Sequence, residues 1–518
     1  CYRNSIYPTE ELREILFRVD LSAEVKQAAS VVSYALVDGA GKCLGEGRAT
    51  GAAIGRPLAL PLPDLAPGSY TLRVEAVKAD GTAQAGTETT IHKLAPPPAG
   101  HEVRIDENRN LLVDGKPLFA IGWYGSVPVE DPRPDVVALQ NVQTPVVVDL
   151  PDVSGIAKAY REHGIYSIVS VELGRLFYTF KLWQSGKEEL RKTTEEYHTL
   201  TEPSAEVRRM ARELVEAVRG EPGLVGYYIA DEPEIHDTRS SYLEAYYRYL
   251  CELDPYHPVF VTNDTIDGLV THGYKCADVL NPDPYSPEWD YVPSFLRKVN
   301  EVAELGKTTY VTLWHSTSQT HFVREYGTAP PYPYKVFRNQ YFVSIALGAK
   351  GFTAYTSPFF MNEIEYRYGL PYVWRELRFL EKAILAPEPT EALQVEARPG
   401  VTSWAREVGG RVYLVLANHK PGAAYARVSW APLKTRRSLT VLSEGREVKV
   451  TGGVFEDRFG EGDVHVYTDA PEAKGFPTTQ EVTAELAQRE KEAVKPGNLL
   501  HWTHGTTARC SAGYYAPW

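Results

Sequence analysis

The feature that most constrains this chain is an alternation of short apolar runs with helical stretches between Phe119 and Leu385. β-rich runs separated by helix-length segments predict a parallel sheet covered by helices. Eight such runs can be counted, at residues 120–123, 145–149, 166–172, 226–232, 259–263, 279–282, 309–314 and 351–356. Eight strand–helix units in a segment of this length predict a (β/α)8 TIM barrel in an α/β protein, with a doubly wound sheet as the structural alternative.

The helices between these runs have recognisable signals. Ser204 can cap a helix on which one face of 3.6-residue period is apolar. That face comprises Val207, Met210, Ala211, Leu214 and Val218. A second helix is expected at residues 334–349, just before the last run.

The segments on either side of the barrel alternate apolar and polar residues around Pro-Gly and Asp-Gly turns, which is typical of antiparallel sheets. We therefore expect an Ig-like β-sandwich at 1–95, a Pro-rich linker, the barrel domain at 101–388 and a C-terminal all-β sandwich at 389–470. A connector helix is expected at 471–496. The remaining residues, 497–518, resemble the first strand of a discoidin-like carbohydrate-binding module.

Charge and composition exclude several classes of partner. The formal net charge of −12 argues against nucleic acid, and no apolar run approaches the roughly 20 residues of a membrane-spanning helix. Five dispersed cysteines without a CxxC pair, and no HExxH, Gly-rich phosphate loop or GxSxG motif, predict neither a metal nor a cofactor. The 33 Tyr and 9 Trp favour a carbohydrate partner, on which flat rings can stack.

The fourth run carries the strongest chemical signal, because it ends abruptly in carboxylates around a proline, Ala230-Asp231-Glu232-Pro233-Glu234. Catalytic side chains of a barrel come from the C-terminal ends of its strands. Alternation with Tyr228 and Ala230 directs Glu232 to the barrel axis, where burial beside a second carboxyl should raise its pKa, as a general acid requires. We expect Glu234 to cap the following helix instead.

This motif resembles the Asn-Glu-Pro motif on strand four of clan A glycoside hydrolases, the β-galactosidase-like and cellulase-like barrels. The preceding sandwich and the segment Val113-Asp114-Gly115-Lys116-Pro117 are also similar to that group. The resemblance implies that Glu232 is the general acid/base, and that Asp231 stands where the family has an Asn that hydrogen-bonds a sugar hydroxyl. The family's nucleophilic Glu at the end of strand seven has no counterpart, since Trp314-His315-Ser316 stands there.

A second carboxylate must then come from another strand end. The candidates are Asp149, Glu172, Asp283, Glu363 and Glu365, of which we favour Asp283. Carboxyls about 5–5.5 Å apart suit a retaining enzyme and roughly 6.5–9.5 Å an inverting one.

Other side chains at strand ends are predicted to contact substrate. The rings are Trp123, Tyr124, Tyr285, Trp314 and Tyr355, and the polar groups are Asn263 and His315. Packing of loops onto the barrel rim is the alternative role for each ring.

The sequence thus predicts a secreted or cell-surface glycoside hydrolase without metal or cofactor, acting on an oligo- or polysaccharide. A barrel that binds glycans without cleaving them, and a scaffold that only spaces its flanking domains, are the alternatives. The lack of a strand-seven carboxylate favours the former of these two.

Overall fold

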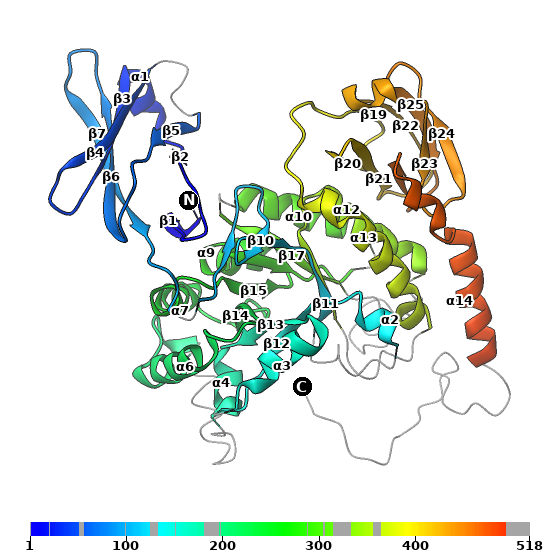
Figure 1. The fold of residues 1–518 in the computed structure, drawn as a ribbon, viewed down its shortest axis with the longest axis horizontal. Coiled ribbons are helices and arrows are strands. Elements are labelled where there is room, and N and C mark those ends of the chain that lie inside the picture. Colours follow the sequence, from blue (N-terminus) through cyan, green and yellow to red (C-terminus); the bar gives the residue numbers. More distant parts are fainter. Residues whose placement is uncertain are drawn as a thin grey trace. The chain divides into compact units, whose positions relative to one another are not determined.

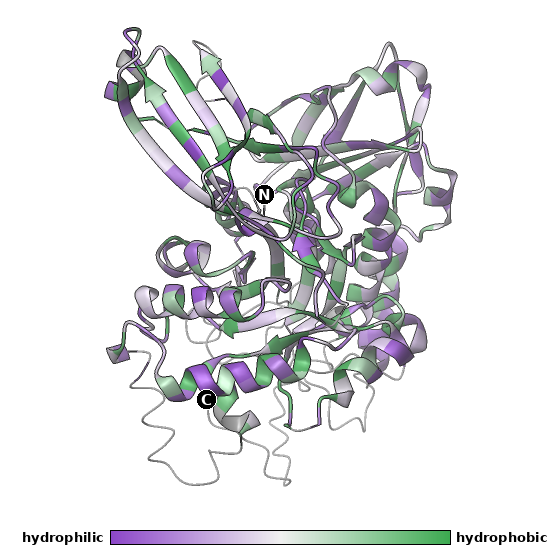
Figure 2. Ribbon diagram, turned by 60° about the vertical axis from the view of Figure 1, so that its left-hand side comes forward, coloured by the Kyte–Doolittle hydropathy of each residue, from purple (hydrophilic) through white to green (hydrophobic). Residues whose placement is uncertain are grey.

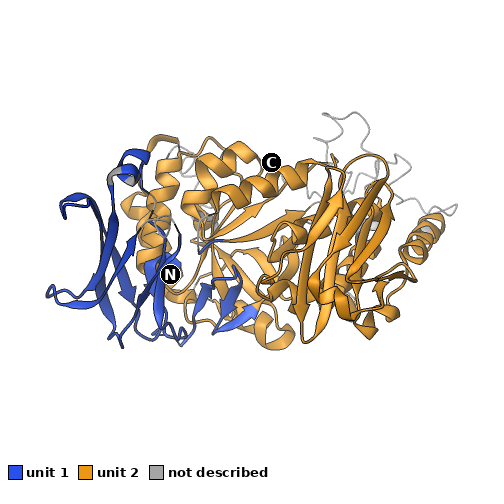
Figure 3. Ribbon diagram, turned by 90° about the horizontal axis from the view of Figure 1, so that it is seen from above, with its two compact units in different colours: residues 1–117, 304–307 blue, residues 118–303, 308–518 orange. Residues whose placement is uncertain are grey.

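The computed structural model describes residues 2–19, 21–50, 56–98, 100–124, 133–150, 152–180, 196, 198–286, 288–303, 306–313, 333–355 and 364–493. The chain forms two compact units. Unit 1 comprises Cys1–Pro117 with Glu304–Lys307, and unit 2 comprises Leu118–Ala303 with Thr308–Trp518 (Figure 3). The division at Pro117 falls later than the boundary at residue 101 that the linker predicted.

Unit 1 is built from antiparallel strands, apart from one short parallel pair. A five-stranded sheet has the order β1-β7-β6-β3-β4, and β2 pairs with β5. The strands are β1 (Ser5–Ile6), β2 (Glu14–Phe17), β3 (Val31–Val37), β4 (Cys43–Thr50), β5 (Leu58–Pro61), β6 (Gly68–Val77) and β7 (Ala83–Lys93), with helix α1 (Ala23–Ala28) after β2. Val32, Leu36, Leu60 and Leu72 belong to the core of this part. A three-stranded sheet of β8 (Val103–Ile105), β9 (Leu111–Val113) and β10 (Lys116–Leu118) follows.

Unit 2 contains a closed barrel of eight strands in chain order, all paired in parallel (Figure 1). The strands are β11 (Ala120–Tyr124), β12 (Val142–Val146), β13 (Tyr166–Ser170), β14 (Leu224–Ala230), β15 (Val259–Asn263), β16 (Val279–Pro282), β17 (Thr308–Leu313) and β18 (Gly351–Tyr355). The predicted (β/α)8 barrel is therefore confirmed, and the doubly wound alternative is excluded.

Two strand positions differ from the expected ones in ways that matter for the site. The run at 145–149 was three residues late, because β12 begins to pair with β11 at Val142 and Val147 is already exposed. β13 and β14 end earlier than expected, at Ser170 and Ala230, so that Glu172 and Glu232 lie two residues beyond their strands.

Helices connect the strands and cover the barrel. They are α2 (Pro134–Val137), α3 (Ser154–His163), α4 (Leu173–Thr179), α6 (Ala205–Val218), α7 (Ser240–Leu253), α8 (Ile266–Gly268), η4 (Leu269–Gly273), α9 (Tyr274–Cys276), α10 (Tyr291–Val302), α12 (Tyr334–Ala346), η6 (Glu365–Gly369) and α13 (Leu370–Leu385). The hydroxyl of Ser204 accepts the N–H of Val207, as a cap should, and the predicted apolar face of α6 is buried. Figure 2 shows hydrophobic and hydrophilic residues alternating along these helices. The helix expected at 334–349 ends at Ala346.

The C-terminal part of unit 2 has two antiparallel sheets, ordered β19-β22-β25 and β20-β21-β26-β23-β24. The strands are β19 (Gln394–Ala397), β20 (Val401–Val408), β21 (Arg411–Asn418), β22 (Ala424–Ser429), β23 (Ser438–Val441), β24 (Arg446–Lys449), β25 (Val454–Phe459) and β26 (Val464–Thr468). Helix α14 (Thr479–Ala493) follows, in the region where a connector helix was expected. Residues 497–518 lie outside the described residues. No helix in the described ranges is long and apolar enough to cross a membrane.

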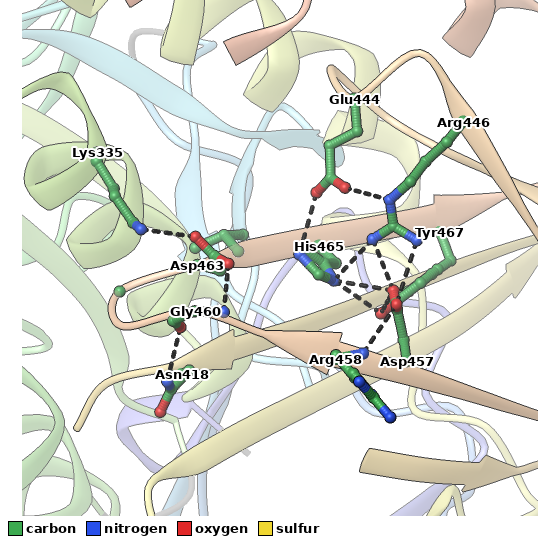
Figure 4. A network of polar contacts seen from close by, with 12 residues as sticks. Lys335, Asn418, Glu444, Arg446, Asp457, Arg458, Gly460, Asp463, His465 and Tyr467 are labelled. Atoms are coloured by element: carbon green, nitrogen blue, oxygen red, sulfur yellow. Dashed lines mark hydrogen bonds and ion pairs between the residues drawn. The ribbon is translucent and has the colours of Figure 1, made fainter. Parts of the chain in front are cut away.

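A polar network holds the C-terminal sheets together (Figure 4). His465 contacts Asp457 at 3.0 Å and Glu444 at 3.2 Å, and Arg446 contacts Asp457 at 2.8 Å. Burial raises the pKa of Asp457, but hydrogen bonds from His465 and Arg446 lower it more, so that this carboxyl stays ionised. An ion pair between Lys335 of α12 and Asp463, at 2.7 Å, connects the barrel helices to the C-terminal sheets.

Candidate active site

Three neighbouring strand ends bring acidic residues to one edge of the barrel. Asp231 and Glu232 follow β14, Asp264 follows β15, and Asp283 follows β16. The backbone N–H of Glu232 donates to the carbonyl of Thr262, and that of Asp283 donates to the carbonyl of Asn263, each over 3.1 Å. Strand β15 therefore fixes the backbone of both acidic residues.

The chain turns sharply at Glu232. Its backbone φ of 42° lies in the left-handed region, which residues other than glycine rarely adopt. We predicted that alternation along the strand would direct this side chain to the barrel axis. Because β14 ends at Ala230, strand alternation does not set its direction. The turn at Glu232 and the bond to Thr262 set it instead. Strain at such a position is typical of functional sites.

Glu232, Asp264 and Asp283 form a compact carboxyl cluster, in which one oxygen of each lies within 4.8 Å of the others. Burial raises the pKa of Glu232 to about 7; a hydrogen bond from Asp283 acts in the opposite direction, and the charge of Asp231 adds to the increase. Burial and the proximity of Glu232 raise the pKa of Asp283 well above its usual range. Glu232 and Asp283 therefore share a proton near neutral pH.

Glu232 and Asp283, the predicted pair of carboxyls, are in contact. Their separation is smaller than the one expected for a hydrolase. A direct hydrogen bond between two carboxyls is shorter than the separations of roughly 5–9.5 Å that retaining and inverting enzymes use. The oxygens of the cluster would suit a hard cation such as Ca²⁺.

Asp283 is almost completely buried, with 2% exposure, and its Oδ1 has no hydrogen-bond partner among the described residues. A buried carboxyl oxygen without a partner costs free energy, on the order of 1–3 kcal/mol. A ligand or water that donates to this oxygen would remove that cost.

Asp231 is held by two phenols. The hydroxyls of Tyr124 and Tyr228 each donate to Oδ1 of Asp231 over 2.7 Å, and they lie 2.6 Å from each other. Tyr124 ends β11 and Tyr228 lies in β14, so that the inner faces of two different strands fix one carboxyl.

The aromatic side chains Tyr124, Tyr355 and Tyr285 form a continuous series of ring contacts. Ring centroids are 5.8 Å apart between Tyr124 and Tyr355, and 6.0 Å apart between Tyr355 and Tyr285. Burial and then the charges of the acidic residues raise the pKa of Tyr285 and Tyr355, so these phenols are neutral donors. Three of the rings predicted to contact substrate are thus assembled beside the carboxyls.

Glu172 follows β13 on the other side of Asp231. Burial, and next the charge of Asp231, raise its pKa to about 7, while Arg175 at 3.7 Å opposes this shift. Its side chain keeps 21% exposure, so it can still meet a ligand.

Glu234 does not cap the following helix, contrary to expectation. Its carboxylate accepts the side-chain N–H of Asn263 over 2.9 Å and the backbone N–H of Thr265 over 3.0 Å. A Cβ at Gly268 would lie 2.1 Å from this carboxyl, and one at Gly273 would lie 2.0 Å from Oδ1 of Asn263. The two glycines make room for a buried clamp, and Asn263, with 0% exposure, belongs to it rather than to a substrate contact.

Two of the other predicted site residues lie elsewhere. Trp123 is 1% exposed and packs against Trp374 of α13 with centroids 4.9 Å apart, because it faces the helices while Tyr124 faces the barrel interior. Asp149 is exposed in the loop after β12. Trp314, His315 and Glu363 lie outside the described residues, as does the side chain of Glu365 in η6.

Sequence reasoning missed Asp264 and the role of Tyr228 as a donor. The signal for Asp264 was present, since this carboxylate directly follows the strand at 259–263. The role of Tyr228 depends on the turn after Ala230, which no local pattern specified.

The fold and this site define an α/β protein with a (β/α)8 barrel, flanked along the chain by β domains, and with a carboxyl- and tyrosine-rich cluster at the C-terminal ends of its strands. No protein-family model matches the chain, and no curated protein matches it. Similar solved structures are glycoside hydrolases. An Anoxybacillus α-amylase has 11% identity and a TM-score of 0.44, covering 64% of this chain and 87% of its own.

Two β-glucuronidases are also similar. That of Lactobacillus rhamnosus has 14% identity and a TM-score of 0.33, covering 66% of this chain and 58% of its own. That of Parabacteroides merdae has 10% identity and a TM-score of 0.34, covering 86% of this chain and 72% of its own. At these scores the fold assignment rests on the barrel topology itself.

Proposed function

We propose that this protein is a glycoside hydrolase that cleaves an oligo- or polysaccharide, with Glu232 as the general acid. The observation that carries the proposal is the hydrogen-bonded pair of Glu232 and Asp283 at the C-terminal ends of β14 and β16, the two barrel strands on either side of β15. A carboxyl whose pKa is raised to about 7 keeps its proton near neutral pH and can still release it to a substrate.

In this reaction Glu232 gives its proton to the glycosidic oxygen while the bond to the anomeric carbon breaks. Positive charge then develops on the sugar ring, and the carboxyls of the cluster stabilise it electrostatically. Asp283 is the second carboxyl of the site and shares the proton of the resting pair with Glu232. A water molecule supplies hydroxide to the anomeric carbon, and its remaining proton returns to the carboxyl pair.

The tyrosines beside the pair support a sugar ligand. Tyr124, Tyr285 and Tyr355 offer flat faces with neutral hydroxyl donors, a combination suited to a hydroxylated ring. The proposal includes an extracellular or cell-surface location.

The experiment compares aryl glycosides with good leaving groups and glycosides with poor leaving groups, for the wild type and for Glu232→Gln. A general acid matters most when the leaving group is poor, so kcat/KM of the variant should fall by about 10²–10⁴-fold for poor leaving groups and much less for good ones. Glu288→Gln, at an exposed residue in the loop after β16, is the matched control. Equal losses on both substrate types would exclude Glu232 as the proton donor.

A glycan-binding barrel without turnover is the second candidate. The observation in its favour is that Glu232 and Asp283 are closer to each other than the carboxyls of either hydrolytic mechanism. Proton NMR of the first-formed anomer separates the candidates, because hydrolysis gives one anomer initially and binding alone gives no product.

A further inference from the structure

The interior of the barrel contains a row of buried polar side chains, one from each of five consecutive strands. The interior of such a barrel is usually filled by branched apolar side chains. Here each member of the row is at most 3% exposed, so each polar group needs a hydrogen-bond partner inside the barrel. In strand order from β18 back to β14, the row consists of Thr353, Thr312, Asn281, Thr262 and Tyr228.

The hydrogen bonds among the first four of these side chains have a single direction. An amide oxygen can only accept, so Thr312 donates to Oδ1 of Asn281 over 3.1 Å. This uses the only proton of Thr312, and Thr353 is therefore the donor of the 2.7 Å bond between the two hydroxyls. The amide N–H of Asn281 donates to Oγ1 of Thr262 over 2.7 Å. The proton of Thr262 is thus directed away from Asn281.

Thr262 continues this direction to Tyr228, with whose phenol its hydroxyl makes a hydrogen bond. Burial, and next the charge of Asp231, raise the pKa of Tyr228, whereas the bond from Thr262 opposes this shift. A bond that favours the ionised phenol is one donated to its oxygen. The oxygen of Tyr228 therefore accepts from Thr262, and its own proton goes to Oδ1 of Asp231 over 2.7 Å.

The amide of Asn281 determines this direction. If a carboxylate stood at its position, both oxygens would accept, and Thr262 would donate to it instead of to Tyr228. The lone pairs of Thr262 would then face Tyr228 and attract the proton that now binds Asp231. Hydrogen bonds that run in one direction polarise one another, so the present order also makes Tyr228 a stronger donor to Asp231.

We propose that Thr262 and Asn281 are positioning residues, which direct the phenol proton of Tyr228 to Asp231 and so hold this carboxyl in place beside Glu232. The effect of this order on turnover rests on the proposed function. The order itself is a property of the resting protein and goes beyond that function.

The direct test is neutron diffraction from crystals of the full chain grown in heavy water. We expect the deuterium on Tyr228 to be directed to Asp231, and that on Thr262 to be directed to Tyr228. Deuterium on Thr262 directed to Asn281, or on Tyr228 directed to Thr262, would overturn the inference. This result does not require turnover, so a protein that cleaves no glycoside but shows the expected order would contradict only the hydrolase.

The kinetic test compares Asn281→Asp, Thr262→Val and their combination on the acid side of the pH profile, where a change in the pKa of Glu232 no longer alters the rate. Asn281→Asp should lower kcat/KM by about tenfold or more, because it reverses the proton of Thr262. Thr262→Val should lower it by no more than about threefold, because valine cannot accept the proton of Tyr228. The combined variant should return to the level of Thr262→Val.

A purely structural role predicts the opposite order, since the combined variant loses more hydrogen bonds than Asn281→Asp alone. A combined variant less active than Asn281→Asp would therefore overturn the inference. Thr308→Val is the matched control, because Thr308 is 0% exposed and its hydroxyl has no partner among the described residues, and kcat/KM should not change. If Asn281→Asp does not fold, the neutron structure of the wild type decides.

Discussion

The carboxyl groups of Glu232, after β14, and Asp283, after β16, are hydrogen-bonded to each other across the end of the intervening strand β15, and burial raises the pKa of both. Acid catalysis requires the protonated form of Glu232, so kcat/KM should fall as pH rises through about 7. The slope should approach tenfold per pH unit. A pH profile of kcat/KM on a substrate with a poor leaving group measures this limb.

Removal of a neighbouring negative charge should move the same limb. The charge of Asp264 raises the pKa of Glu232, so Asp264→Asn should shift the limb to lower pH by a few tenths of a unit to about one unit. Asp267→Asn, three residues further along the chain and exposed, should leave the limb in place. A shift to higher pH in Asp264→Asn would contradict the assignment of the limb to Glu232.

The same pKa shift makes Glu232 a source of instability at high pH. Its pKa is raised from 4.5 to about 7 on folding, so the folded state binds more protons than the unfolded state between these pH values. The stability that protonation of Glu232 provides is fully present below about pH 4.5 and is lost as the pH rises through about 7. Glu232→Gln removes this loss. Urea unfolding measures this effect. Relative to the wild type, the free energy of unfolding of the variant should increase by about 2 kcal/mol between about pH 5 and pH 8. A constant difference across this range would argue against a buried, titrating Glu232.

Sequence patterns determined those parts of this molecule that depend on short stretches of chain. β15 and β16 have the bounds that their apolar runs predicted, and Glu232 and Asp283 come together because the C-terminal ends of all the parallel strands meet at one face of a barrel. Contacts that depend on tertiary packing could not be predicted. Asn263 is buried because Gly273, ten residues later, leaves room for its side chain.

Tyr228 and Tyr227 are adjacent residues with opposite surroundings, so they form a matched pair for mutagenesis. The hydroxyl of Tyr228 donates to Asp231 over 2.7 Å, and that of Tyr227 donates to Asp254 over 2.6 Å. Tyr228→Phe should lower kcat/KM by about tenfold or more, the expected effect of losing a hydrogen bond to a charged group. Tyr227→Phe should lower the melting temperature and leave kcat/KM near the wild-type value. Equal kinetic effects would mean that the phenol of Tyr228 only supports the fold.

Glu234 should act as a positioning residue through Asn263 and Thr265. In Glu234→Gln an amide NH₂ must face one of two N–H donors, so the end of β15 and both carboxyls that it fixes should shift. We expect kcat to fall by about tenfold, with a smaller change in KM. Combination with Asn263→Asp restores a donor–acceptor match and should recover part of kcat. An unchanged kcat in the single variant would contradict this role.

Arg338 and Glu376, on α12 and α13, form a buried ion pair at 2.9 Å with exposures of 5% and 2%. Arg338 also donates to the carbonyl of Val464 over 2.8 Å, and Ser443 donates to Glu376, so the pair connects the barrel helices with the C-terminal sheets. Glu376→Gln leaves the buried guanidinium without its counter-charge, which typically costs about 3–5 kcal/mol. Glu213→Gln in the exposed pair Arg209–Glu213, at 2.7 Å, should cost less than about 0.5 kcal/mol. Chemical unfolding of both variants measures the difference, and similar losses in the two would show that burial gives the Arg338–Glu376 pair no special role.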